Sequence, residues 1–222
     1  KRQKAAGPRT TDHESSSVFG HVQAYMIDLL QCLLDTGALQ VAPAGRPFWY
    51  TSGTLGPYYI NTDYLYGSRK KAERLLEVID REKTDPLRCP TVLLGEVRRN
   101  YSEDPVYRGV VDGVVEMARG TDGAGDTEYV SGGERRDWFF SLMAGELLGK
   151  PLLLIYKDLT VVSVSREGTI SKIDRLDGKR TTHVADLITE ASSYTRAWIP
   201  AIADRGGTLV SAINVVDRDQ GG

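Results

Sequence analysis

The spacing of apolar and polar residues predicts two helices and a β-rich segment in the first third of the chain. Apolar residues recur every three or four positions over residues 18–34, and Gly37 follows as a suitable helix end. Residues 39–63 are rich in aromatic and β-forming side chains interrupted by proline and glycine, which indicates short strands and loops. A second helix is predicted over residues 68–83, with Ser68 as its N-cap and charges opposite an apolar side.

The middle of the chain alternates between strand-like and helix-like segments. Strands are predicted at Thr91–Leu94, Thr127–Ser131 and Leu152–Tyr156, and helices at Val106–Arg119 and Trp138–Leu148. Gly120–Asp126 (GTDGAGD) is predicted to be a loop. Alternating strands and helices predict a parallel sheet covered by helices.

The last third predicts a β-hairpin followed by a strand, a helix and a final strand. The hairpin joins Leu159–Val164 to Thr169–Ile173, and the last three elements are Thr181–Ala185, Ser193–Ala203 and Thr208–Val216. The predicted fold class is therefore α/β, a doubly wound and mainly parallel sheet flanked by helices, with a small N-terminal lid and a β-hairpin loop. We expect a disordered tail at residues 1–17, a helix and lid segment at 18–66, and an α/β core at 67–222.

Composition narrows the functional classes. The chain has 222 residues, 41% hydrophobic and 26% charged, and a net charge of −2 from well-mixed charges, which argues against nucleic-acid binding. The most apolar stretch, Trp138–Tyr156, is broken by Glu146, Lys150 and Pro151, so no membrane span is expected. Three histidines and two distant cysteines form no metal-ligand pattern, so we expect no protein metal site and a reducing cytoplasm.

Two turns are placed where ligands bind in a doubly wound sheet, at strand ends that lead into helices. Ser131–Trp138 (SGGERRDW) combines glycines, which allow close backbone approach, with two arginines suited to phosphate oxygens. The alternative for this turn is a capped loop with solvated charges, and the two readings weigh about equally. Thr182–Tyr194 (THVADLITEASSY) leads from a strand through Asp186 into hydroxyl side chains near a helix start, which on its own is more often a plain N-cap.

Taken together and in order, four stretches resemble the type I phosphoribosyltransferases, and among them the orotate phosphoribosyltransferases. The resemblance is carried by DTGALQV with TSGTLGPYYIN, by YVSGGERRDWFFSLMAGELLGKPLLLIYKD, by VADLITEASS and by ADRGGTLVSAINVVDRDQGG. These stretches are similar to the family's lid, its pyrophosphate loop, its signature for 5-phosphoribosyl 1-pyrophosphate (PRPP), and its last strand. The resemblance covers most of the chain after residue 17.

The resemblance implies roles for individual residues. It implies catalytic roles for Lys157 and Asp186, with Lys157 opening a mobile loop. It implies that PRPP and its pyrophosphate contact Arg135, Arg136, Asp186, Thr189, Ser192 and Ser193. It implies that the base contacts Tyr58, Tyr59 and Arg218. The alternatives are that one of the two tyrosines is a core strand residue, because neighbours on a strand face opposite ways, and that Arg218 is simply solvated.

The resemblance also implies a reaction, in which a base nitrogen such as that of orotate attacks the ribose of PRPP as pyrophosphate leaves, with Mg²⁺ as cofactor and a homodimer as the assembly. Three positions depart from the family pattern: Ala185, Glu190 and Ala191 replace an acid, a threonine and a glycine. A carboxylate about 4 Å from a phosphate would cost on the order of 1 to 4 kcal/mol, unless Glu190 turns outward or is protonated. Two functions therefore remain open: phosphoribosyl transfer, or a catalytically inactive protein of this fold that senses a nucleotide, a base or another anion.

Overall fold

The computed structural model describes residues 28–50 and 53–219. The expected tail at 1–17 and the start of the first predicted helix, residues 18–27, lie outside these ranges. The rest of that helix is confirmed as α2 (Leu29–Asp35), which Asp28 caps through its side chain and which ends before Gly37.

The body of the protein is built on one six-stranded sheet in the order β10-β9-β5-β6-β7-β8. The first four of these strands are parallel, and β7 and β8 run antiparallel at one edge. Their bounds are β5 Tyr129–Gly133, β6 Leu152–Ile155, β7 Val161–Val164, β8 Ile170–Lys172, β9 Arg180–Ile188 and β10 Thr208–Asp217. The mainly parallel sheet that the sequence predicts is therefore confirmed.

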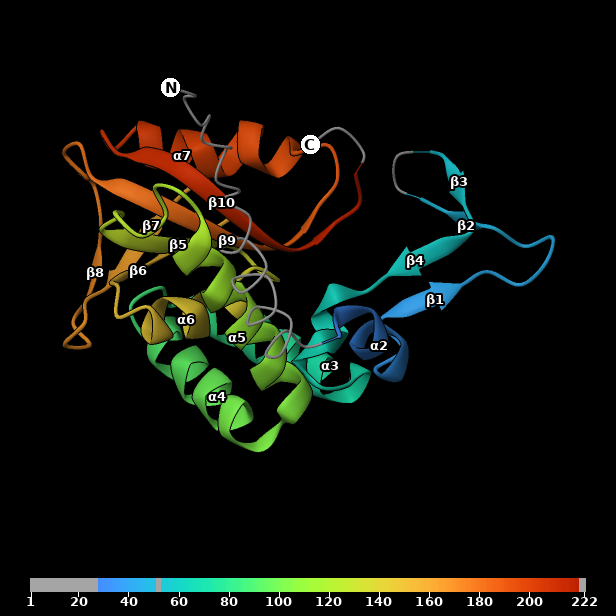
Figure 1. The fold of residues 1–222 in the computed structure, drawn as a ribbon. Helices are drawn as coiled ribbons and strands as arrows, with labels where there is room; N and C mark the ends of the chain where they lie inside the picture. Colours follow the sequence, from blue (N-terminus) through green and yellow to red (C-terminus); the bar gives the residue numbers. More distant parts are fainter. Residues whose placement is uncertain (1–27, 51–52, 220–222) are drawn as a thin grey trace, which may run out of the picture.

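Helices cover both faces of this sheet (Figure 1). On one face α5 (Pro105–Gly120) and α6 (Trp138–Leu147) contact the strands. The helix α4 (Cys89–Glu103) packs against both of them, and α3 (Arg69–Glu82) packs against α4. On the other face lie the π-helical turn η2 (Tyr194–Trp198) and α7 (Ile199–Ala203). The central strand β6 is buried along its whole length, as expected of a strand covered on both faces.

One predicted strand is wrong. Thr91–Leu94 lies inside the helix α4, in which Cys89, Leu93 and Val97 are buried at four-residue spacing and Pro90 stands in the first turn. A short apolar run cannot be assigned to a strand or a buried helix by its periodicity alone, and proline in the first helical turn favours the helix. Residues 89–120 therefore contribute two helices and no strand.

The predicted β-hairpin is confirmed, although it is part of the main sheet. β7 pairs with β6 as well as with β8, so the residues after Lys157 and Asp158 turn directly into a buried strand. The apolar sequence Val161–Val164 explains this placement, because all four residues are buried there.

The N-terminal segment forms an arm that projects from the body (Figure 1). Two antiparallel pairs make up this arm, β1 (Leu39–Val41) with β4 (Tyr58–Ile60), and β2 (Phe48–Trp49) with β3 (Leu55–Gly56). It carries exposed apolar side chains at Val41, Trp49 and Leu55.

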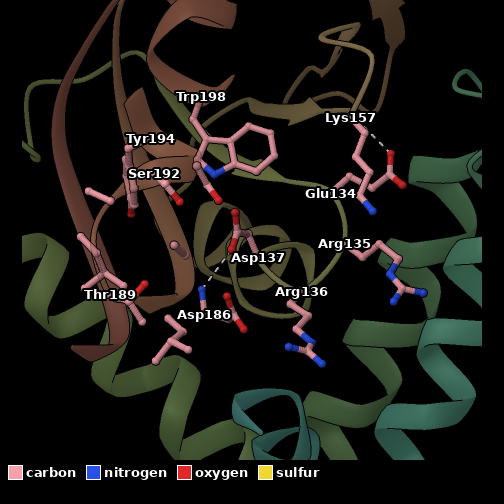
Figure 2. A pocket seen from close by; sticks show the side chains of 15 residues that line it. Glu134, Arg135, Arg136, Asp137, Lys157, Asp186, Thr189, Ser192, Tyr194 and Trp198 are labelled. Atoms are coloured by element: carbon pink, nitrogen blue, oxygen red, sulfur yellow. Dashed lines mark hydrogen bonds between the residues drawn. The ribbon is translucent and has the colours of Figure 1, made fainter. Parts of the chain in front are cut away.

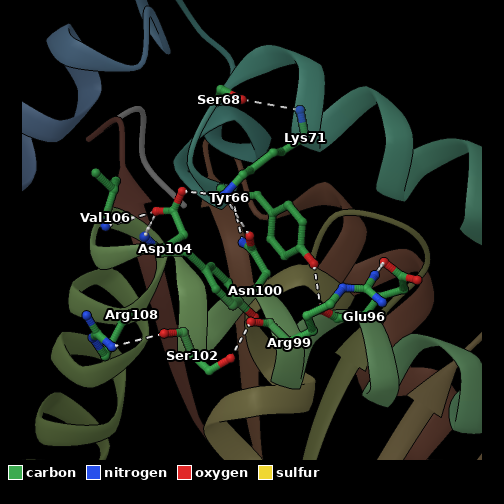
Figure 3. Close-up of polar contacts among 11 residues, drawn as sticks. Tyr66, Ser68, Lys71, Glu96, Arg99, Asn100, Ser102, Asp104, Val106 and Arg108 are labelled. Atoms are coloured by element: carbon green, nitrogen blue, oxygen red, sulfur yellow. Dashed lines mark hydrogen bonds and ion pairs between the residues drawn. The ribbon is translucent and has the colours of Figure 1, made fainter.

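A polar network fixes the base of the arm to the helices (Figure 3). The 3₁₀ helix η1 (Thr62–Tyr66) ends where Asn100 donates to the Tyr66 carbonyl at 2.8 Å, and the Tyr66 hydroxyl donates to the Glu96 carbonyl at 3.0 Å. Lys71 bonds both Asn100, at 3.0 Å, and Asp104, at 2.7 Å. These contacts hold η1 in place, and η1 reaches the pocket described next.

Candidate functional site

A pocket of about 380 Å³ lies at the carboxyl ends of β5, β6 and β9. One wall is the loop Glu134–Asp137 with Lys157, and the other is the segment from Ala185 to Ser193 (Figure 2). The pocket thus brings the two turns chosen from the sequence to one site, as expected for parallel strands whose ends meet at one edge of a sheet. Its volume is that of an ordinary small-molecule site.

Asp137 connects the two walls. Its Oδ2 accepts the backbone N–H of Gly133 at 2.9 Å, and its Oδ1 accepts the backbone N–H of Asp186 at 3.2 Å. The ring of His183 adds a third contact, from Nε2 to Oδ2 at 3.3 Å, and its Nδ1 lies 2.9 Å from the Ser131 hydroxyl. Asp137 stands inside the stretch SGGERRDW, but nothing in the pattern of that stretch distinguishes it from a helix cap.

The arginines of the first wall are already paired with acids of neighbouring helices. Arg135 forms an ion pair with Asp80 of α3, and the Nε of Arg136 lies 3.4 Å from Oδ1 of Asp63 in η1. Lys83 reaches Asp80 at 2.8 Å and Glu134 at 3.1 Å. The hydrogen bond from Lys83 is the main reason that the pKa of the Asp80 carboxyl lies below its usual value.

Lys157 stands at the opening of the first wall, and its backbone N–H donates to Oε2 of Glu134 at 3.1 Å (Figure 2). Asp63, Asp80 and Lys83 were missed by sequence reasoning, because they lie 51 to 73 positions from the loop residues that they contact and belong to no motif. Asp63 is 2% exposed, and its Oδ1 accepts no hydrogen bond from the described residues.

Asp186 is the buried acid of the second wall. The Thr62 hydroxyl of η1 donates to its Oδ2. Burial, followed by the negative charge of Asp137, raises the pKa of Asp186 to about 7, while Thr62 and Arg136 oppose that rise. Burial and the neighbouring acid thus both favour the protonated form of Asp186.

The rest of the second wall is an open turn at the start of a helical run. Thr189, Ser192 and Ser193 line the pocket, and residues 192–203 are helical, so the first turn of a helix, whose N–H groups have no partner within that helix, borders the pocket. Ala191 has a φ of 52°, a left-handed conformation that glycine adopts without strain. Glu190 is exposed and does not line the pocket, so the carboxylate that the sequence places in the turn is directed outward.

Trp198 completes the pocket, although no sequence signal pointed to it. Its indole packs on Gly133, where an added methyl group would overlap the ring, and stacks at 6.0 Å on the buried His183. A tryptophan within an apparent helix is normally assigned to the core, and Trp198 indeed belongs to a core cluster as well as to the pocket.

The residues expected to hold a base lie beside the pocket rather than in its lining. The guanidinium of Arg218 lies 4.8 Å from the centre of the Tyr50 ring and 5.3 Å from that of Tyr58, a pair of cation–π contacts. Tyr59 packs instead against Phe48 and Tyr50. The backbone N–H of Arg218 donates to Ile188, a pocket residue, at 3.1 Å, which places this cluster next to the second wall.

Chemically, the site offers cations, hydroxyls, helix N–H groups and three acids around one cavity, a set that suits a phosphorylated sugar. No group of three or more His, Cys, Asp or Glu side chains suited to a metal occurs within residues 28–50 and 53–219. Within the same ranges, no helix has the length and apolarity needed to cross a bilayer.

Comparison with solved structures shows what this architecture is similar to. The UMP synthase of Leishmania donovani superimposes on 93% of this chain with a TM-score of 0.55 and 15% identity, and this chain spans only 36% of that protein. Orotate phosphoribosyltransferase of Aeropyrum pernix covers 87% of this chain and 83% of its own, at 20% identity and a TM-score of 0.49. Adenine phosphoribosyltransferase of Leishmania donovani covers 86% and 68%, at 12% identity and a TM-score of 0.47.

The chain therefore has the type I phosphoribosyltransferase fold, as its sequence resemblance predicts. At these identities the likeness is one of fold alone. No protein-family model matches the sequence, and no curated protein matches it either.

Proposed function

We propose that the protein transfers a 5-phosphoribosyl group from PRPP to a pyrimidine base, as an orotate phosphoribosyltransferase does, with release of pyrophosphate. The observation that carries this proposal is the pocket itself, a cavity of about 380 Å³ with the loop Glu134–Asp137 on one side and the turn Thr189–Ser193 on the other. A cavity with cations at one end and helix N–H groups at the other suits a ligand that has phosphate groups at both ends.

In this proposal each wall has its own task. The turn of Thr189, Ser192 and Ser193 binds the 5′-phosphate, Asp186 accepts hydrogen bonds from the ribose hydroxyls, and Arg136 and Lys157 stabilise the negative charge of the departing pyrophosphate. Arg135 contributes to pyrophosphate binding only when its ion pair with Asp80 breaks. The base lies toward Ile188, where Arg218 and Tyr58 supply a guanidinium and an aromatic face.

Magnesium fits this site as an ion held together with the substrate. Mg²⁺ is commonly bound by one or two carboxylates and by the phosphates of the substrate, and Asp186 is the pocket carboxylate placed for that role. When bound, the ion would neutralise part of the pyrophosphate charge. Asp186 must be ionised to serve as its ligand.

We also propose that the protein is a homodimer that buries the exposed apolar residues of the arm. Trp49 is 72% exposed and Val41 is 71% exposed, while Arg46 is the sole charged residue between positions 36 and 60, so two copies of the arm would not repel each other. Sedimentation of wild type and of Trp49→Ser tests this. A monomer in wild type overturns it, and so does a dimer that the substitution leaves unchanged.

One observation favours a second candidate function, a catalytically inactive protein that senses a nucleotide, a base or another anion. The arginines of the first wall are neutralised by Asp80 and Asp63, and the segment after Lys157 is a buried strand instead of a basic loop. A site whose cations are already paired can bind a weakly charged ligand without supplying the charge that transfer requires.

A single assay separates the two functions. Purified protein is mixed with PRPP, Mg²⁺ and orotate, and the loss of orotate absorbance is followed. Transfer predicts a loss that Lys157→Ala reduces and that Lys70→Ala, an exposed lysine of α3, leaves unchanged. A flat trace, together with calorimetric binding of a base or nucleotide, would reject transfer and support the sensor.

A further inference from the structure

The turn that carries Lys157 is short and closely bonded. It joins β6 to β7, and the backbone N–H of Tyr156 donates to the Thr160 carbonyl at 2.9 Å. The N–H of Leu159 donates to the Tyr156 carbonyl at 3.0 Å, and the side chain of Asp158 accepts the N–H of Thr160 at 2.9 Å. A turn of this length leaves its backbone little freedom, so the position of Lys157 depends on how the whole turn is held.

Leu159 is the strained residue of this turn. Its φ of 65° is left-handed, a conformation that is unfavourable for a residue with a Cβ atom. Its side chain packs against a core cluster that contains Ile155, Val161 and Trp198, and its carbonyl accepts a hydrogen bond from Nη2 of Arg205 at 2.9 Å. Backbone strain persists only where the surroundings determine the conformation, and here the core cluster and Arg205 do so.

Arg205 connects three segments that are far apart in the sequence. Besides the Leu159 carbonyl, its guanidinium reaches the Ile173 carbonyl directly after β8, through Nε at 2.7 Å, and the Ala201 carbonyl of α7, through Nη1 at 2.8 Å. The helix α7 belongs to the helical run 192–203, which starts at the second wall of the pocket. Arg205 therefore links the far end of that run to the turn that carries Lys157.

The turn is thus held from two sides. On the pocket side, Glu134 accepts the backbone N–H of Lys157 at 3.1 Å (Figure 2), and on the other side Arg205, which does not line the pocket, binds the Leu159 carbonyl. We propose that Arg205 is a positioning residue: by fixing this turn against α7 it sets the position of Lys157, and through Lys157 it sets the affinity for pyrophosphate. This inference rests on the proposed function, which assigns pyrophosphate to Lys157, and extends it to a residue outside the pocket.

The chemistry of the guanidinium determines which substitutions are informative. Its five N–H donors are fixed in one plane, so a single side chain can serve all three carbonyls. Glutamine at position 205 has a shorter, neutral amide with two N–H donors, and lysine keeps a cation on a stem of similar length. Since hydrogen bonds from a charged donor are the stronger ones, lysine should retain part of the restraint on the turn and glutamine should retain less.

The test is the affinity of the full chain for inorganic pyrophosphate, measured by calorimetry without added divalent metal. Arg205→Gln is expected to weaken binding by about fivefold and Arg205→Lys by about twofold. In a Lys157→Ala background the same two substitutions are expected to change affinity by less than about 1.5-fold, because no ammonium group is left to position. The matched control is Arg175→Lys, at an arginine whose side chain is 81% exposed, and it should leave the affinity unchanged.

A purely structural role for Arg205 would lower the melting temperature of both variants and leave their pyrophosphate affinity unchanged, and that result overturns the inference. An equal loss of affinity with and without Lys157 also overturns it, because Arg205 would then act through some other group. So does a wild-type protein that does not bind pyrophosphate. Should Arg205→Gln fail to fold, Arg205→Lys carries the comparison alone, and an unchanged affinity in that variant rejects the proposal.

The outcome is separable from that of the proposed function. Orotate consumption by a protein in which Arg205 and Lys157 act independently removes the inference and keeps the transferase. Pyrophosphate binding in which the effect of Arg205 depends on Lys157, without orotate consumption, keeps the inference and removes the transferase.

Discussion

The two walls of the pocket are built in opposite ways. The first wall, Glu134–Asp137, is tied down through ion pairs of its arginines with Asp80 and Asp63 and through hydrogen bonds to Asp137. The second wall, Ala185–Ser193, ends in the turn Thr189–Ser193, which has exposed serines, a left-handed alanine and a helix N-terminus. One wall has its charges paired before a ligand arrives, whereas the other is open to solvent.

This difference indicates which wall can supply affinity for a phosphate group and which wall can supply selectivity for pyrophosphate. An arginine that is already paired must leave its acid to bind a phosphate, so part of the interaction energy is lost in the exchange. Unpaired N–H groups at a helix start exchange only water. We therefore expect the second wall to supply most of the affinity for a monophosphate, and the first wall to determine whether pyrophosphate also binds.

The largest expected effect comes from overpacking at Gly133, the last residue of β5, directly before the first wall. Gly133→Ala places a methyl group against the indole of Trp198, and overpacking of this kind is expected to lower the free energy of unfolding by about 2 to 3 kcal/mol. Urea denaturation measures it. The control Gly95→Ala, in the interior of α4 with open space around it, should raise stability by about 0.5 to 1 kcal/mol. Equal stability of Gly133→Ala and wild type would mean that the indole does not sit on this glycine.

The next effect is on the backbone of the second wall. Ala191→Gly removes the strain of a φ of 52° and is expected to raise the free energy of unfolding by about 0.5 to 1 kcal/mol. The comparison variant Ala197→Gly, which lies in helical η2, should lower it by a similar amount. Both are read from urea denaturation, and a loss of stability in Ala191→Gly contradicts the left-handed conformation of the turn.

A smaller effect is expected from releasing the cations of the first wall. Asp80→Asn removes the ion-pair partner of Arg135 and leaves Lys83 paired with Glu134, so sulfate should bind about threefold more tightly. Calorimetry at a single pH measures the change, and Asp122→Asn, which removes the same charge from the exposed loop before β5, is the charge-matched control. Unchanged affinity would show that Arg135 does not turn toward the pocket once it is free.

The smallest effect is expected at Glu190. Because its side chain is exposed and directed away from the pocket, Glu190→Gln should change sulfate affinity by less than about twofold. A gain of tenfold or more would instead place this carboxylate at the phosphate, as the sequence on its own allows.

Much of the fold could be predicted from the sequence. Residues 68–83 and 138–148 show the helical period or a cap, and the succession of strands and helices after residue 127 was predicted from the alternation of elements. The order of the strands within the sheet was not predicted. The strand predicted at Thr91–Leu94 was wrong because a four-residue apolar run is compatible with both a strand and a buried helix. In the structure this run packs among helices as part of α4.

The candidate site was predicted in part. Local patterns identified Arg136, Asp186 and the turn at Thr189, because glycines, charges and hydroxyls at strand ends have a recognisable spacing. The same patterns do not indicate which acid faces which cation. Asp63 and Asp80 lie on segments that have no motif.

The helix-flanked sheet and the position of the two turns along the chain follow from the sequence alone. Periodicity, capping and apolar runs are signals that extend over only a few residues, so they can be read without the tertiary structure. Only the tertiary structure decided that Asp137 meets Asp186, that the arginines of one wall are paired and that Glu190 faces outward. Charge pairing and the pKa of a buried acid depend on distances between side chains that are far apart in sequence, and folding alone sets those distances.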